Sequence, residues 1–289
     1  MNIADIRHRI DSIQQTRQIT QAMRLISSAK MRQGMKRAVV NDSYVSEVRL
    51  SIRCLLASAG QIEHRYLNRA TSGRSAYVVI TSERGLAGGY NANVLKMAYQ
   101  HMQTYEPVRV YAIGNVAYDF FLEHHLEPNV DYLHAIDMPH LQEARKLSWE
   151  LCRLFIEGEV DQVFVFYSHL IHSMNCQPMV VRLLPVRVSD FPDVPMPDSL
   201  QAGSLFFEPS PGRVLERLIP QYVIGSVYAT LIQSFASEQC ARMAAMDTAT
   251  RNADEILADL RLAYNRERQS SITQEITEIM GGLLEGGVS

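Results

Sequence analysis

The feature that most constrains the fold of this chain is a helical segment at residues 237–280. It holds forty-four residues without Gly or Pro and is rich in strong helix formers. As one helix it would be about 66 Å long, far beyond the average globular helix. One small core cannot cover such a helix, so a second helix must lie beside it.

The partner helix is predicted at residues 2–57. No Pro occurs before Pro107, and at about 1.5 Å per residue the helix would reach about 84 Å. Apolar residues recur at spacings of three and four, as in a coiled-coil seam. The seam residues are Ile3, Ile6, Ile10 and Ile13, and after a polar interval Ile19, Met23, Ile26 and Met31.

Opposite charges on the two segments favour their pairing. Residues 1–57 carry ten Lys/Arg against four Asp/Glu, a net +6, and residues 210–289 carry seven against ten, a net −3. The chain leaves along one helix and returns along the other, so the pair must be antiparallel.

Between the helices, short β-branched runs alternate with helical segments. This alternation predicts a mostly parallel sheet covered by helices. Strands are expected at 77–81, 109–113, 163–167 and 179–184, with helices at 93–105, 116–125 and 140–157. The predicted fold is a long antiparallel coiled coil of the N- and C-terminal helices with an inserted Rossmann-like α/β domain. Its parts are residues 1–58, 74–200 and 210–289, with a linker near Thr71–Gly73 and a Pro-rich end at 190–199.

Composition excludes several classes of protein. The net charge of −3 argues against nucleic acid as a partner. No run approaches the roughly 18 apolar residues of a membrane span, and the start has no apolar signal region. The four cysteines form no CxxC pair and are expected to be reduced thiols, with neither a disulfide frame nor a zinc site.

One glycine-rich turn invites an enzymatic interpretation. Residues 82–91 (SERGLAGGYN) follow a strand and precede a helix, where a turn can hold a phosphate. Its spacing is not GxGxxG, and no GxxxxGK[ST] occurs. A tight turn with Asn91 as helix N-cap is favoured over nucleotide binding. His169 and His172, on one helix face, would lack a third metal ligand. Pro220 should kink the last helix or close a short preliminary one, and Gly281 and Gly282 should fray its end.

The two end segments also carry a dense motif. Residues 236–276 read ASEQCARMAAMDTATRNADEILADLRLAYNRERQSSITQEI, and the first helix contains TQAM and AKMR at 20–23 and 29–32. In these residues, and in the turn at 82–91, the chain closely resembles the gamma subunit of F-type ATP synthases. The turn departs from the family pattern at Glu83, Ala87 and Tyr90 but keeps the glycines.

The resemblance implies a central rotor shaft that needs no cofactor and is not itself a catalyst. Such a shaft transmits torque between the ion-driven c-ring and the catalytic hexamer, and so regulates ATPase activity and ion flow. The implied partners are three alpha and three beta subunits, an epsilon subunit and the membrane c-ring. The implied location is the cytoplasmic face of a bacterial cell membrane, reached only through these partners.

The resemblance also assigns positions. Met23, Arg242, Gln269 and Thr273 match contacts with beta subunits, and the net +6 of the first helix would attract an acidic segment of beta. Tyr44, Leu205, Phe207 and Glu208 match contacts of the foot with the c-ring. Ile276, Ile279 and Leu283 match the apolar bearing at the top of the hexamer. No cysteine pair lies near residues 185–210, where chloroplast relatives have a thiol switch, so no redox switching is expected.

Two other classes stay open from the residues alone. An α/β nucleotide-binding enzyme could use the long helices for dimerisation, in which case the isolated chain would bind a nucleotide tightly. A plain coiled-coil scaffold would leave the dense motif at 236–276 unexplained.

Overall fold

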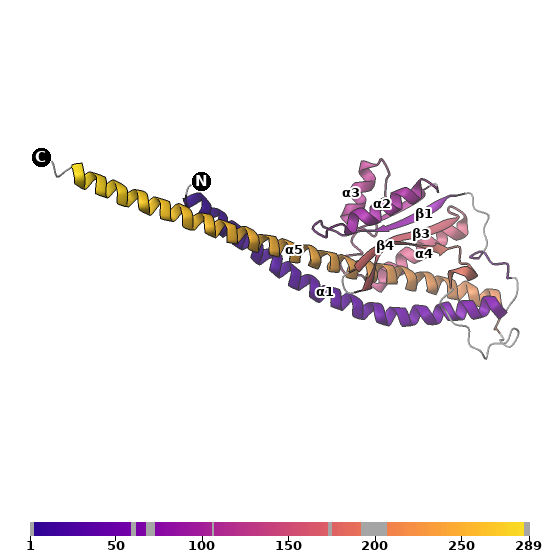
Figure 1. Cartoon of the computed structure of the whole chain (residues 1–289). Helices are drawn as coiled ribbons and strands as arrows, with labels where there is room; N and C mark the ends of the chain where they lie inside the picture. Colours follow the sequence, from indigo (N-terminus) through magenta and orange to yellow (C-terminus); the bar gives the residue numbers. More distant parts are fainter. Residues whose placement is uncertain are drawn as a thin grey trace. The chain divides into compact units, whose positions relative to one another are not determined.

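The computed structural model describes residues 3–58, 62–67, 73–105, 107–172, 175–191 and 207–285. Two helices dominate it: α1 (Ile3–Ser58) with 56 residues and α5 (Pro211–Glu285) with 75 (Figure 1). The chain divides into two compact units. We call Met1–Ile26 with Met243–Ser289 the helix-pair unit, and Ser27–Arg242 the sheet unit. Each long helix contributes residues to both.

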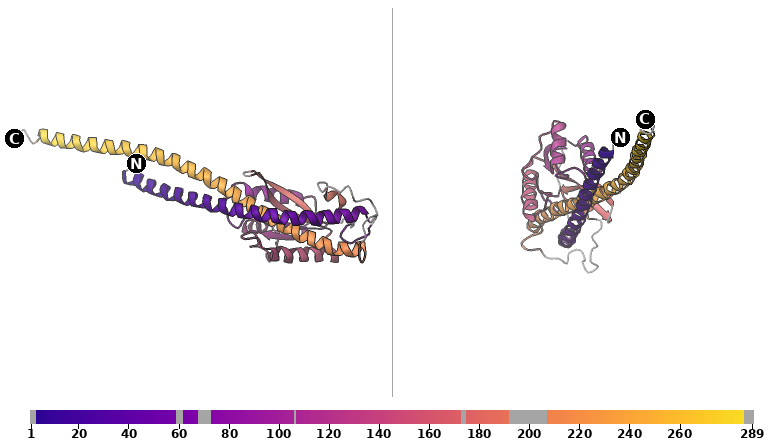
Figure 2. Two further views of the ribbon diagram at one scale, coloured as in Figure 1. Left: turned by 90° about the horizontal axis from the view of Figure 1, so that it is seen from below. Right: turned by 90° about the vertical axis from the view of Figure 1, so that its left-hand side faces the viewer.

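In the helix-pair unit, α1 and α5 lie side by side and antiparallel. Arg17 pairs with Asp254 at 2.5 Å, and Arg24 pairs with Asp247 at 3.8 Å. Moving forward along α1 therefore means moving back along α5, and both helices can be followed in Figure 2. The antiparallel pairing is confirmed, and basic residues of the first helix meet acidic residues of the last.

The buried side of α1 follows a seven-residue repeat that small and polar residues disguise. Apart from the half-buried Ile13, every position of this repeat is buried. The positions are Ile6, Ile13, Thr20, Ser27, Gly34, Asn41, Val48 and Leu55. A strict period of seven is typical of a coiled-coil seam.

Part of the predicted seam was wrong. Ile19 and Ile26 are 60% and 57% exposed, whereas Thr20 and Ser27 beside them are buried. The prediction followed the large apolar residues. Where two helices approach closely, however, small residues fill the seam and large ones are displaced from it.

The sheet unit is built on four strands in the order β2-β1-β3-β4. β1 (Ser75–Ile80) lies between β2 (Pro107–Ile113) and β3 (Gln162–His172) and is parallel to both. β4 (Asn175–Leu184) pairs antiparallel with β3. The mostly parallel sheet is confirmed, and all six residues of β1 are buried, as its β-branched run predicted.

Helices cover both faces of this sheet (Figure 1). α2 (Tyr90–Met102) and α3 (Asn115–Glu123) pack on the face that carries Tyr77 and Val79. α4 (Leu141–Glu157) packs on the opposite face, where Val78 and Ile80 point. Alternate residues of β1 thus enter two separate cores. A short 3-10 turn, Val188–Asp190, follows β4.

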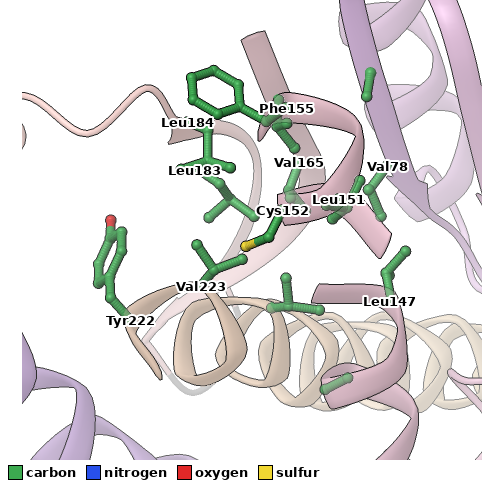
Figure 3. Close-up of a cluster of buried hydrophobic side chains, with 14 of the residues drawn as sticks. Val78, Leu147, Leu151, Cys152, Phe155, Val165, Leu183, Leu184, Tyr222 and Val223 are labelled. Carbon is green, nitrogen blue, oxygen red and sulfur yellow. The ribbon is translucent and has the colours of Figure 1, made fainter. Parts of the chain in front are cut away.

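The larger core joins the sheet to both long helices. Leu151 and Phe155 of α4, Val165 of β3 and Val223 of α5 are fully buried in one cluster (Figure 3). Ile52 of α1 belongs to the same cluster. Burying each such side chain stabilises the fold by about 1.5–3 kcal/mol. The sheet and the adjoining parts of α1 and α5 therefore form one packed body.

Several local expectations were wrong. α5 starts at Pro211 and continues through Pro220, so Pro220 closes no separate preliminary helix within the described residues, and the alternative of a kink there stays a prediction. It also continues through Gly281 and Gly282 to Glu285. His169 lies on β3 and not on a helix.

Other expectations stay predictions. The boundary between the two compact units falls inside both long helices. The predicted domain limits 1–58, 74–200 and 210–289 follow secondary structure instead and stay a prediction. The linker at residues 71 and 72 and the Pro-rich segment 192–199 lie outside the described residues. None of the described helices combines the length and the apolar character that crossing a bilayer demands.

Candidate functional site

The glycine-rich turn at residues 82–91 is fastened by one side chain. Asn91 accepts a hydrogen bond from the backbone N–H of Ser82 at 2.9 Å and donates one to the Ser82 hydroxyl at 2.8 Å. α2 begins at Tyr90, and its N-cap is Gly89, which makes no side-chain cap bond. The prediction of Asn91 as N-cap was wrong, because its amide closes the turn back onto the end of β1.

Arg242 of α5 sits against this turn. Its guanidinium donates hydrogen bonds to the backbone carbonyls of Arg84 at 3.1 Å and Gly85 at 3.2 Å. The turn thus presents carbonyl oxygens to a cation. A phosphate needs backbone N–H groups at such a turn, which is the opposite polarity. The geometry here argues against the nucleotide-binding interpretation.

The same guanidinium pairs with Glu238, one helical turn earlier on α5. The two side chains are only 14% and 7% exposed. Burial raises the pKa of the Glu238 carboxyl, and the Arg242 and Lys30 cations counteract part of that rise. A buried carboxylate needs such compensation, so Arg242 holds the helix and the turn together through charge as well as geometry.

Further hydrogen bonds fix this part of α5 to the sheet. The Ser237 hydroxyl donates to the carbonyl of Ser168 on β3 at 2.9 Å. The buried Tyr90 hydroxyl donates to the carbonyl of Ser234 at 3.2 Å. The partners on α5, which are Ser234, Ser237 and Arg242, lie in or beside the motif at 236–276. Its first third therefore serves attachment of α5 to the α/β layers, a role that spacing alone did not reveal.

A polar pocket of about 560 Å³ opens beside this junction. Its lining mixes cations with carboxylates, including Lys30, Arg84, Glu83 and Asp137. His134 lies 3.1 Å from Glu83. Charges of both signs select no single class of charged ligand, and across the described residues no group of three or more His, Cys, Asp or Glu could hold a metal.

The other residues assigned to beta-subunit contacts belong to the helix-pair unit. Gln269 and Thr273 are exposed one turn apart on α5, and the Thr273 hydroxyl donates to the Gln269 carbonyl at 2.9 Å. Met23 is half-buried on α1. The structure brings Gln269 and Thr273 onto one exposed face, while Arg242 belongs to the sheet unit and is engaged there.

The foot residues differ in availability. Tyr44 is 46% exposed and donates to the Gln221 side chain at 3.1 Å. Phe207 is half-buried against the larger core, and Glu208 is exposed. Leu205 lies outside the described residues. Tyr44 and Glu208 are thus the exposed members of the described foot residues.

The bearing residues lie near the end of α5. Ile276 and Ile279 are 55% and 65% exposed. Leu283 lies within the helix, but its side chain is not among those that the structure describes. Together with Ile272, which is 47% exposed, Ile276 and Ile279 form an apolar stripe at helical spacing on the surface of α5.

The structure brings two thiols together that the sequence keeps apart. Cys240 of α5 hydrogen-bonds to Cys176 of β4, and the Cys176 thiol also donates to the Ser237 carbonyl at 3.5 Å. The four cysteines, which all lie among the described residues, form no disulfide. Their distance in sequence hid this contact, because it depends on how β4 packs against α5.

Comparison with known proteins gives a consistent family. The family model described as ATP synthase matches residues 2–284. The ATP synthase gamma chain of Ruminiclostridium cellulolyticum is 37% identical over 288 residues, covering 97% of each chain. The gamma chain of Acetivibrio thermocellus is 35% identical over 288 residues, covering 97% of this chain and 98% of its own.

Solved structures agree in fold. A chain of the Euglena gracilis mitochondrial ATP synthase, from an OSCP/F1/c-ring structure in rotational state 3, superposes with a TM-score of 0.66 at 17% identity. The match covers 98% of this chain and 94% of that one. A chain from the Tetrahymena thermophila central stalk and c-ring gives 0.57 at 20% identity, covering 80% and 99%.

Proposed function

This chain belongs to the ATP synthase gamma chain family, and from that premise we propose that its paired helices turn inside a hexamer of three alpha and three beta subunits. Its role is that of the central stalk, a non-catalytic rotor subunit, since catalysis in these enzymes occurs in the beta subunits. The remaining partners, an epsilon subunit and the membrane c-ring, are part of the proposal. So is a location at the cytoplasmic face of a bacterial membrane.

The observation that supports torque transmission best is the continuity of α5. One helix of 75 residues supplies residues to the packed sheet unit and to the helix-pair unit. At residues 234–242 this helix is hydrogen-bonded to β3, to Tyr90 and to the glycine-rich turn, through its side chains and the Ser234 carbonyl. A twist applied to the sheet unit would therefore pass into the helix through directional bonds and not through apolar contact alone.

Gln269 and Thr273 are proposed as contacts that deliver this torque to beta subunits, and Met23 of α1 is proposed to face an acidic segment of beta. Their polar side chains are exposed and make no described side-chain bond to α1. Arg242 is proposed as a further contact, with a guanidinium that is already partly committed within the chain. Tyr44, Leu205, Phe207 and Glu208 would meet the c-ring, and Ile276, Ile279 and Leu283 the hexamer bearing.

The torque contacts are tested by substitution in the intact complex. Gln269→Ala with Thr273→Ala should lower coupled ATP synthesis while leaving the yield of assembled complex unchanged. Arg242→Ala with Gln269→Ala should also lower coupled ATP synthesis without abolishing assembly, but the yield of complex should fall, because Arg242 stabilises the sheet unit. Glu255→Ala, also exposed on α5, serves as the control. Synthesis at the control rate in both double variants would remove these residues from the torque path.

A further inference from the structure

A second pocket, of about 570 Å³, lies in the sheet unit between α1, α4 and α5. Asn41 of α1 donates a hydrogen bond to the backbone carbonyl of Gly225 of α5 at 3.1 Å. A Cβ on Gly225 would come within 2.8 Å of the Val45 side chain. The two long helices therefore touch at this point, and Leu141 and Arg145 of α4 supply the third wall.

The walls of this pocket are largely apolar. Val40, Leu141, Ile224 and Tyr228 contribute to its lining. Val40 is 75% exposed and Leu141 is 43% exposed, so the apolar surface continues to the mouth. Apolar side chains around a concave space of this size are typical of a binding site for a small ligand, which buries most of its own surface there.

The charged residues of the lining all have one sign. Lys36, Arg37 and Arg145 line the pocket, and its lining contains no carboxylate. Throughout the part of the chain that the structure describes, no acidic side chain forms an ion pair with these three cations. Arg37 donates a hydrogen bond to the backbone carbonyl of Pro139, at 3.3 Å. Many other arginines, such as Arg242 and Arg182, are paired with carboxylates.

We propose that this pocket binds an amphipathic carboxylate, a molecule with an apolar chain and one anionic head. The apolar tail of the ligand would cover Val40, Leu141 and Ile224. Its anionic head would accept charge-assisted hydrogen bonds from Arg145 and Lys36. Such a ligand would contact α1, α4 and α5 at once, and so would tie the two long helices to the sheet layers. Neither the family nor the central-stalk role requires it.

The ligand is a free molecule and not a lipid held in a bilayer. Cations that recognise a membrane surface are spread over a face that meets it, and no cavity is needed. Here the cations surround a concave apolar space. The headgroup chemistry is shared with fatty acids in vesicles, so the experiment needs an arm for each source.

The test is a calorimetric titration of the purified full-length protein with dodecanoate, kept below the concentration at which dodecanoate forms micelles. The chain has one tryptophan, Trp149, one turn beyond Arg145 on α4, and its fluorescence gives a second readout. We expect saturable binding of one dodecanoate per chain. Acetate, which lacks the apolar tail, should not compete with dodecanoate. Dodecyltrimethylammonium, which has the tail but the opposite charge, should not compete either.

Two variants locate the site. Arg145→Gln removes the proposed partner of the head and should weaken binding about tenfold or more. Val40→Trp fills the mouth without changing charge and should weaken it comparably. Arg153→Gln, on the same helix but paired with Glu157, is the matched control and should bind as the parent chain does. Far-UV circular dichroism and thermal unfolding check that each variant is folded. Tyr44 is left unchanged, since it is proposed for a partner contact.

Three results would overturn the proposal. One is the absence of saturable binding to the folded parent chain. Another is equal binding by dodecanoate and by dodecyltrimethylammonium, which would indicate nonspecific apolar adsorption. The third is binding of the protein to phosphatidylglycerol vesicles that persists in excess dodecanoate. If Arg145→Gln and Arg153→Gln also weaken this vesicle binding equally, the cations recognise a membrane surface and not a ligand in the pocket.

Discussion

Arg242 and Glu238 form a largely buried ion pair on α5, and the same guanidinium donates to the carbonyls of Arg84 and Gly85. A glycine-rich turn whose position between a strand and a helix would suit a phosphate thus binds an arginine of the chain itself. In a stalk subunit the glycine-rich turn therefore has a structural role, because it fixes a long helix to the α/β layers.

Removing this arginine should destabilise the sheet unit strongly. Arg242→Ala leaves Glu238 buried without its nearest cation, which should cost about 3–5 kcal/mol at neutral pH. Arg251→Ala is the control, because Arg251 pairs with Asp247 at a surface where both side chains are exposed by 72% and 38%. That change should cost no more than about 1 kcal/mol. Urea unfolding of the purified chain measures both.

The loss caused by Arg242→Ala should depend on pH. Burial already raises the pKa of Glu238, and without Arg242 it should rise further. A group with a raised folded pKa contributes stability that is fully present below its unfolded pKa, about 4.3, and lost as pH rises through the folded value. The deficit of the variant should therefore be small near pH 4 and grow toward pH 8. A deficit that is constant over this range would contradict the role of Glu238.

The close approach of the long helices at Gly225 should not tolerate a methyl group. Alanine there would place its Cβ 2.8 Å from the Val45 side chain, and crowding of this kind costs about 1–3 kcal/mol. Gly212→Ala is the matched control, since nothing lies within 4 Å of a Cβ at that position of the same helix. It should be neutral or stabilising by up to about 1 kcal/mol. Equal effects of the two changes would mean that α1 and α5 are not in contact at Gly225.

In the helix-pair unit, Thr20 and Thr250 should show energetic coupling. Their hydroxyls lie 2.9 Å apart, and Thr20 is buried. Thr20→Val or Thr250→Val alone leaves the other hydroxyl without this partner, whereas the double variant removes both. A double-mutant cycle in urea should give a coupling of about 0.5–1.5 kcal/mol. Additive effects would show that the two hydroxyls do not bond.

The sequence was a good guide to the elements and a poor one to their contacts. Both long helices, the four strands and the antiparallel pairing followed from periodicity, Gly/Pro punctuation and charge. The seam was wrong at Ile19 and Ile26, because the buried Thr20 and Ser27 beside them do not register as part of an apolar stripe. The engagement of Arg242 was missed for a different reason: the carbonyls that bind it belong to a turn 157 residues away in sequence, and backbone acceptors leave no residue-type signal.

The native thiols should resist labelling in the folded chain. Burial raises the pKa of Cys176 and Cys152 to about 12, whereas an unfolded cysteine has a pKa of about 8.5. Since the thiolate is the reactive form, iodoacetamide at pH 8 should modify these cysteines far faster in urea than in buffer. Mass spectrometry of the alkylated peptides measures the rates. Fast labelling of the folded chain would contradict the packing of β4 against α5. Dithiothreitol should likewise leave ATP hydrolysis by the complex unchanged.

This resistance allows the most direct test of the central claim, that the chain is the rotating stalk of an ATP synthase. Glu123→Cys, at the exposed end of α3, introduces one reactive thiol for a bead in complexes whose hexamer is fixed to glass. On addition of ATP, the bead should rotate stepwise in one direction. A bead that stays still or only diffuses, on complexes that hydrolyse ATP, would contradict the account.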